Sequence, residues 1–136
     1  MILQTDNRLN KQINMYGCYF MSLLFIANRH IGYKLSTTVI TKLYTDFIEL
    51  GFMESNCFIN DGDGILNYLG LECRYTNKHE SPDYETSHKQ IEILCLKYPS
   101  YKHFVVGDGF GNIAYNPMGL TASGAFKHSK RIFKLL

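Results

Sequence analysis

The sequence has no tryptophan, only three prolines, and no apolar stretch long enough to cross a bilayer. Its longest apolar run, residues 15–27, is broken by Ser22 and contains Gly17 and Cys18, and its length suits a buried helix. Residues 1–12 lack the apolar core of a secretory signal. We therefore expect a cytoplasmic protein without a signal peptide, a transmembrane segment or membrane contact.

Charge of one sign is also scarce. The 136 residues carry 14 basic and 12 acidic side chains, which gives a net charge of +2 with histidine neutral. Nucleic-acid binding usually depends on a strong, clustered positive charge, and this balance does not provide one. We expect no nucleic-acid partner.

Cofactor and metal motifs are missing as well. The four cysteines form no C-x-x-C pair, and no two histidines have zinc-ligand spacing. D-G-D-G at 61–64 does not satisfy the ligand spacing of a calcium-binding EF-hand loop. G-D-G-F-G at 107–111 lacks the spacing of a dinucleotide fingerprint and the helix that should follow it. We expect neither a metal nor an organic cofactor. Free thiols are the simplest interpretation of the cysteines, and two disulfides remain an alternative on count alone.

Hydrophobic residues make up 46% of the chain and charged residues 19%, which is a globular composition. The length fits one domain, residues 1–136. Apolar spacing and turn residues predict helices first and antiparallel strands second, an α+β fold. The expected helices cover 18–28, 38–50 and 65–69, and the expected strands cover 71–76, 91–98, 102–108, 112–116 and 131–136. We expect a loop at 77–89.

Cys18 is the first candidate for chemistry, because it directly follows a glycine at the start of the predicted helix 18–28. A helix N-terminus lowers the pKa of a thiol, and the thiolate is the nucleophile. A cysteine nucleophile also needs a base and a group that orients the base. His103 begins the strand H-F-V-V, and Asn116 ends the next strand of the same hairpin, so their side chains are predicted to meet.

An oxyanion donor is also needed, and Gln12 lies six residues before Cys18. We interpret the remaining cysteines, Cys57, Cys73 and Cys95, as core residues because their surroundings are apolar or strand-like. The other histidines lie in loops or polar segments, where we expect them to be solvated.

Four features follow one another along the chain: Q-x-x-x-x-x-C opening an apolar helix, H-F-V-V, a glycine turn and Y-N-P. In this order they resemble the motifs of the papain-like cysteine peptidases. Within that superfamily it is most similar to the bacteriocin-processing peptidases that cut double-glycine leaders. These have the order Gln, Cys, His and Asp before Pro, where this chain has Gln12, Cys18, His103 and Asn116. Papain itself has Asn at the last position. The chain departs from the bacteriocin-processing pattern at N-M-Y-G-C-Y, where that group more often has D-C-G.

The resemblance covers roughly residues 12–117 and implies a papain-like fold, with the catalytic Cys18 starting a central helix that packs on a C-terminal antiparallel sheet. It implies hydrolysis of a peptide or isopeptide amide by a Cys18–His103–Asn116 triad, with Gln12 in the oxyanion hole and a peptide or protein as substrate. The chain also resembles a small plasmid- or phage-borne family of free-standing domains, which implies a bacterial or phage-encoded protein and no function.

Two other functions remain open at this point. The domain could be a catalytically inactive papain-like binding module, such as a phage structural component or an inhibitor of a host enzyme. Its 19 Tyr and Phe side chains suit a protein partner at the cleft or at an aromatic surface. Alternatively, the same Cys-His chemistry could cleave amide bonds in peptidoglycan.

Overall fold

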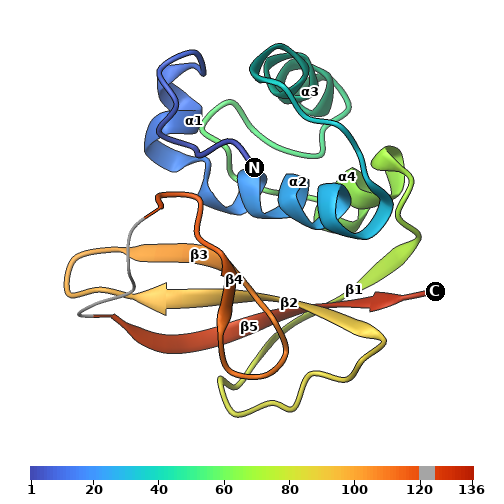
Figure 1. The fold of residues 1–136 in the computed structure, drawn as a ribbon, viewed down its shortest axis with the longest axis vertical. Helices are drawn as coiled ribbons and strands as arrows, with labels where there is room; N and C mark the ends of the chain where they lie inside the picture. The colour runs from blue at the N-terminus through green and yellow to red at the C-terminus, as the bar shows by residue number, and fades with distance from the viewer. Residues whose placement is uncertain (120–124) are drawn as a thin grey trace.

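The N-terminal half of the chain is helical, and a computed structural model describes residues 1–119 and 125–136. The helices are α1 (Lys11–Tyr16), α2 (Cys18–Ile31), α3 (Thr37–Glu49) and α4 (Gly62–Leu69). Figure 1 shows them as a layer on one side of a sheet, with α2 lying across the middle of the molecule next to β3.

Within the described residues the sheet has five strands: β1 (Cys73–Glu80), β2 (Gln90–Lys97), β3 (Lys102–Gly107), β4 (Ile113–Tyr115) and β5 (Phe126–Leu135). Their order is β1-β5-β2-β3-β4, and the neighbouring strands are antiparallel. This confirms the predicted α+β fold, including the start of a central helix at Cys18. The assignment of residues 1–136 to one domain stays a prediction.

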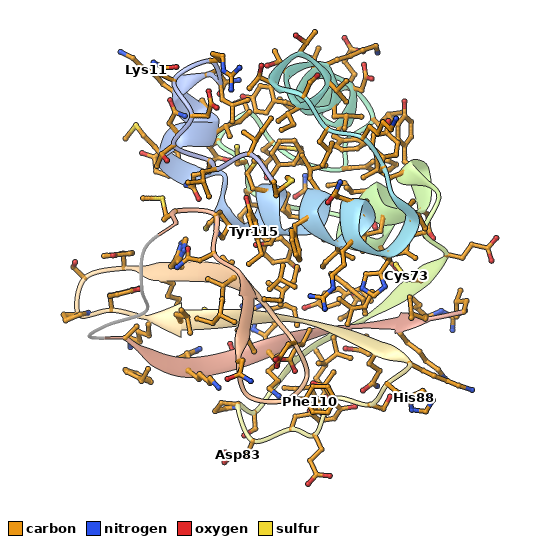
Figure 2. All side chains as sticks on the ribbon, viewed as in Figure 1. Lys11, Cys73, Asp83, His88, Phe110 and Tyr115 are labelled. Atoms are coloured by element: carbon orange, nitrogen blue, oxygen red, sulfur yellow. The ribbon has the colours of Figure 1, made fainter. Side chains whose placement is uncertain are left out.

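Helix α2 is central because its side chains are apolar on nearly every face. The helix ends at Gly32, whose φ of 67° is the left-handed conformation that glycine adopts without strain. Seven of its side chains are buried, and the core that they enter also includes residues from α3, α4 and the facing side of the sheet. One stacked contact illustrates this layer: the ring of Phe25 on α2 lies 4.6 Å from the ring of Tyr115 on β4, labelled in Figure 2.

Three segments differ from the sequence prediction. The predicted loop at 77–89 is partly wrong, because β1 continues to Glu80 past an irregularity at Asn77, whose φ is +57°. The last strand begins at Phe126 rather than 131 and lies inside the sheet, between β1 and β2. Pairing with β5 on one side extends β1, and such long-range pairing leaves little local signal. Helix α1 was not predicted.

The three cysteines predicted to lie in the core, Cys57, Cys73 and Cys95, are buried, with 3% or less of each residue exposed. All four cysteines carry free thiols. Within residues 1–119 and 125–136, none of the helices has the length and hydropathy that a bilayer span requires.

Candidate functional site

Cys18 lies at a break between two helices. Gly17 ends α1 and precedes α2, and its backbone N–H donates to the carbonyl of Ile13 over 2.9 Å. A Cβ atom at Gly17 would lie 2.6 Å from that carbonyl oxygen, so only glycine allows the approach. No side chain caps α2 at Gly17. The first N–H groups of α2 therefore stay available near the thiol.

The Cys18 thiol is held against the sheet. The backbone N–H groups of Phe104 on β3, of Tyr19 and of Cys18 itself favour the thiolate and lower the pKa of Cys18. Burial has the larger effect and raises the pKa of Cys18 above its ordinary value. The sequence-based expectation of a lowered pKa is therefore wrong for the resting protein, because desolvation outweighs the helix N-terminus. The resting thiol is neutral.

His103 and Asn116 meet as the hairpin predicts. Nε2 of the imidazole lies 2.7 Å from Oδ1 of Asn116. The backbone N–H of Met118 donates to the same Oδ1 over 3.0 Å, which identifies this atom as the amide oxygen. An amide oxygen only accepts, so Nε2 of His103 carries the proton and Nδ1 keeps the lone pair that a base needs.

Burial also sets the charge of His103. The residue is only 6% exposed, and desolvation lowers its pKa more than the hydrogen bond to Asn116 raises it. The imidazole is therefore neutral at pH 7, which is the form that accepts a proton.

Residues near the N-terminus hold the loop that carries Asn116. The backbone N–H of Gln4 donates to the carbonyl of Pro117 over 2.9 Å, and the hydroxyl of Tyr115 donates to the carbonyl of Ile2 over 2.8 Å. Asn14 on α1 donates to the carbonyl of Gln4. The segment before α1 therefore contacts both the loop that carries Asn116 and helix α1, which leads to Cys18. These roles could not be predicted from the sequence, because a contact between residues 113 positions apart leaves no local pattern.

Cys18 and the His103–Asn116 pair, the two halves of the candidate site, lie next to neighbouring residues of β3. The thiol of Cys18 contacts the backbone of Phe104, which directly follows His103. The Phe104 ring packs on Tyr19, 4.8 Å between centroids, and successive strand side chains alternate, so the His103 ring leaves β3 in the other direction. Among the described residues, no hydrogen bond joins the Cys18 thiol to the His103 ring.

Gln12, the predicted oxyanion donor, is exposed on α1. It does not line the cavity at Cys18, and within the described ranges it makes no side-chain hydrogen bond. The structure therefore brings His103 to Asn116 and Cys18 to the neighbouring backbone, whereas Gln12 stays in solvent.

A cavity of about 410 Å³ opens beside Cys18. The rings of Tyr16 and Phe58 at its rim are 51% and 62% exposed. The other lining residues are Tyr19, Asn56, Cys57, Ile59, Tyr75, His79, Phe104 and Arg131. Sequence reasoning missed the last of these, because only the position of β5 inside the sheet brings it to the cavity.

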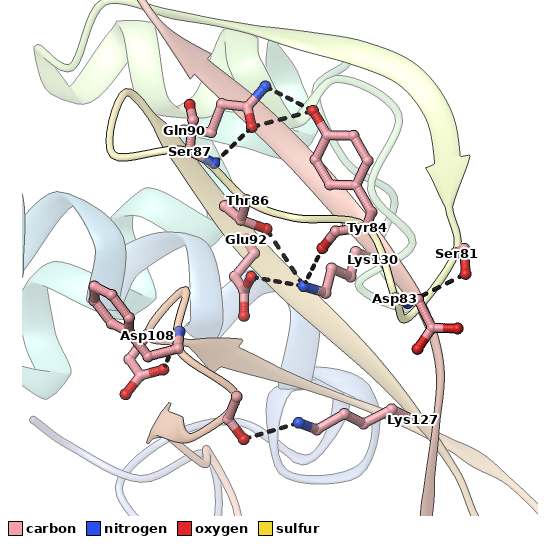
Figure 3. A network of polar contacts seen from close by, with 12 residues as sticks. Ser81, Asp83, Tyr84, Thr86, Ser87, Gln90, Glu92, Asp108, Lys127 and Lys130 are labelled. Atoms are coloured by element: carbon pink, nitrogen blue, oxygen red, sulfur yellow. Dashed lines mark hydrogen bonds and ion pairs between the residues drawn. The ribbon is translucent and has the colours of Figure 1, made fainter.

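A second cavity, of about 390 Å³, lies near the other end of α2 and is lined in part by Arg29, Glu92 and Phe110. Glu92 is 2% exposed and pairs with Lys130 over 3.1 Å. Lys130 also donates to the backbone carbonyl of Tyr84 over 2.7 Å, and Figure 3 shows this network between β2, β5 and the 81–89 loop. It holds the loop against the sheet and lies apart from Cys18.

In the part of the chain that the structure describes, no cluster of three or more His, Cys, Asp or Glu side chains could hold a metal ion. The chain belongs to the family described as "Protein of unknown function, DUF261", whose model matches residues 1–135. No curated protein and no solved structure was found to match it.

Proposed function

We propose that this member of the DUF261 family is a papain-like cysteine hydrolase that cleaves a peptide or isopeptide amide. The observation that carries the proposal is the 2.7 Å contact between Nε2 of His103 and Oδ1 of Asn116, one residue before the backbone that holds the Cys18 thiol. A base held by an amide oxygen, with a thiol at a helix N-terminus nearby, is the arrangement of a Cys-His-Asn triad.

The proposed reaction starts from neutral partners. Because the His103 ring leaves β3 on the side opposite the Phe104 ring, this reaction requires the His103 ring to swing toward α2 when substrate binds. Nδ1 of His103 then takes the proton from the Cys18 thiol as sulfur attacks the substrate carbonyl carbon. Catalytic hydrogen bonds of this kind often tighten only when substrate binds. Asn116 keeps the proton on Nε2, so that Nδ1 stays a base.

The tetrahedral intermediate carries its negative charge on the former carbonyl oxygen. The backbone N–H of Cys18, in the uncapped first turn of α2, is one donor for it. We assign the second donor to Gln12, whose exposed side chain is free to close over bound substrate. His103 then gives its proton to the leaving amine. Water hydrolyses the thioester that remains on Cys18, with His103 as base.

Acyl transfer from p-nitrophenyl acetate tests this chemistry without knowledge of the substrate. Cys18 attacks the acetyl carbonyl, p-nitrophenolate leaves, and the acetyl group stays as a thioester that mass spectrometry locates. We expect a burst of p-nitrophenolate, an acetyl group on Cys18 and slow turnover. The burst should disappear in Cys18→Ala, and the rate constant of the burst should fall by about a hundredfold in His103→Ala.

Cys57→Ala is the matched control, because Cys57 lines the same cavity and its burial raises the pKa of its thiol to about 12. This variant should keep the burst. Acetylation spread over lysines, with no preference for Cys18 and no effect of His103, would contradict the proposal.

One observation favours a second function, a docking cleft without catalysis. Burial keeps both candidate partners neutral, since the pKa of Cys18 is raised and the pKa of His103 is lowered. The exposed rings of Tyr16 and Phe58 also suit a protein partner. In that case Cys18 would show no burst, and Phe58→Ala would weaken partner binding without a change in stability.

A further inference from the structure

Arg131 lines the cavity at Cys18, and among the described residues the lining contains no lysine, aspartate or glutamate. It lies on β5, opposite Ile93 of β2 and His79 of β1, and only 7% of the residue is exposed. It lies two residues before the buried Phe133, and side chains at i and i+2 of a strand share a face, so both point to the side of the sheet that carries the helices. The cavity lining includes both Arg131 and Cys18.

Among the described residues, the guanidinium of Arg131 has two partners, and neither is an anion. One nitrogen, Nη1, donates to the hydroxyl of Ser129 over 2.5 Å. The guanidinium carbon lies 5.1 Å from the centre of the Phe104 ring, a cation–π distance. No carboxylate in the described ranges forms an ion pair with it, and no acidic residue lines the cavity.

An arginine so deeply buried is almost always paired with a carboxylate, because desolvation of an uncompensated charge is costly. The same molecule follows this rule elsewhere, since the buried Lys130 is paired with Glu92. Arg131 has five N–H donors, and the bond to Ser129 uses one of them. The remaining donors and the positive charge therefore suit an anionic group that enters the cavity from outside.

We propose that Arg131 binds a carboxylate of the ligand, so that the site prefers a peptide with an acidic side chain next to the group that meets Cys18. Planar, bidentate recognition of a carboxylate is what a guanidinium does best. The aromatic rings of Tyr19, Tyr75 and Phe104 in the cavity lining lower the local polarity, which strengthens such an interaction. As a statement about substrate the inference rests on the proposed function, but the binding itself does not.

Two alkylating reagents test the inference directly. Iodoacetate carries a carboxylate, and iodoacetamide is its neutral counterpart. Each reacts by displacement: sulfur forms a bond to the methylene carbon, iodide leaves, and the thiol proton passes to solvent. We would measure both rates at Cys18 by mass spectrometry. The ratio of the iodoacetate rate to the iodoacetamide rate should be at least about tenfold higher at Cys18 than for free cysteine at the same pH, because a hydrogen bond to a charged group is worth at least about that factor.

Arg131→Met should lower this ratio to the free-cysteine value, and the ratio corrects for any change in the general reactivity of the thiol. Arg74→Met is the matched control, because Arg74 is an exposed arginine on β1 outside the cavity, and its loss should leave the ratio unchanged. If Arg131→Met does not fold, Arg131→Lys should retain part of the preference. Added acetate should slow iodoacetate at wild-type Cys18 more than an equal concentration of chloride does.

Equal ratios in wild type and Arg131→Met, or a wild-type ratio equal to that of free cysteine, would overturn the inference. These results are separable from failure of the proposed function. A ratio that depends on Arg131, together with absolute Cys18 alkylation rates that do not fall in His103→Ala, would keep the anion site and remove the hydrolase.

Discussion

At Asn116, one oxygen accepts hydrogen bonds from His103 and from the backbone of Met118, so the amide fixes both the ring and its tautomer. Asn116→Ala removes that acceptor. We expect the rate of acyl transfer to fall between tenfold and a hundredfold, because orientation of the base is part of the general-base contribution. Burst kinetics with p-nitrophenyl acetate measure the change.

Asn116→Asp tests the effect of this residue on the pKa of His103. A carboxylate keeps the acceptor and favours the protonated imidazole, so it raises the pKa of His103. The acyl-transfer rate should persist at high pH, and its acidic decline should move to higher pH than in wild type. An unchanged pH profile in both variants would mean that Asn116 only shapes the turn before Pro117.

At the scale of single residues, the sequence predicted the pairing of His103 with Asn116, because a hairpin places consecutive strands side by side. It also predicted Cys18 at a helix start, because Gly17 precedes an apolar run. It could not predict the raised pKa of Cys18, since burial depends on how α2 lies on β3. Arg131 was missed for a similar reason, because nothing local shows that β5 lies between β1 and β2.

At the scale of elements, the break between α1 and α2 positions the thiol. Gly17→Ala places a Cβ atom 2.6 Å from the Ile13 carbonyl oxygen, so the two helices must shift. We expect a loss of about 1–3 kcal/mol in the free energy of unfolding, the usual cost of overpacking, together with altered Cys18 reactivity. Denaturant melts and the Cys18 alkylation rate measure the two effects.

Gly51→Ala is the control for this variant. Gly51 has a φ of 79° and open space around it, so alanine there costs stability through backbone strain. It should leave Cys18 alkylation unchanged. If both variants changed the alkylation rate equally, the position of Gly17 would have no special role.

The 81–89 loop depends on a buried ion pair between strands. Lys130→Met leaves Glu92 buried without its cation, and removal of one partner of such a pair costs about 3–5 kcal/mol. We expect a loss in that range, with faster proteolysis in the loop. Lys127→Met is the matched control, because Lys127 is exposed and donates to the Gly111 carbonyl, and it should cost less than about 1 kcal/mol. Equal losses would contradict this account of the loop.

Helices α2, α3 and α4 and strands β2, β3 and β4 followed from apolar periodicity and glycine turns in the sequence. Helix α1 has only six residues and no continuous apolar face, so periodicity did not reveal it. The length of β1 and the start of β5 depend on each other through pairing, which periodicity within either segment does not show.

For the whole molecule, buried titrating groups set the pH range of stability. The pKa of His103 is lower in the folded than in the unfolded protein, so the unfolded chain binds its proton first as pH falls. This stabilising contribution is complete above pH 6.5 and is lost as pH falls from there to the folded pKa. Two buried cysteine thiols change the stability at alkaline pH. The folded pKa values of Cys57 and Cys73 are raised to about 12 and about 11, so the unfolded chain deprotonates first above pH 9.

Stability should therefore decline on both sides of a plateau between about pH 6.5 and 9. Urea unfolding at a series of pH values measures the curve. His103→Gln, which cannot titrate, should flatten the acidic side, and Cys73→Ala should reduce the alkaline slope. An acidic slope that is unchanged in His103→Gln would show that other groups cause it.

The most direct test of the central claim, that Cys18 and His103 act as a pair, is the rate of iodoacetamide labelling at each cysteine from pH 5 to 10, in wild type and His103→Ala. We predict that Cys18 labels at least about tenfold faster than the three buried cysteines at pH 7.5. The advantage should fall away below the pKa of His103 and disappear in the variant, where burial alone controls the thiol. Identical Cys18 profiles in the two proteins would contradict the pairing and leave a docking cleft as the better account.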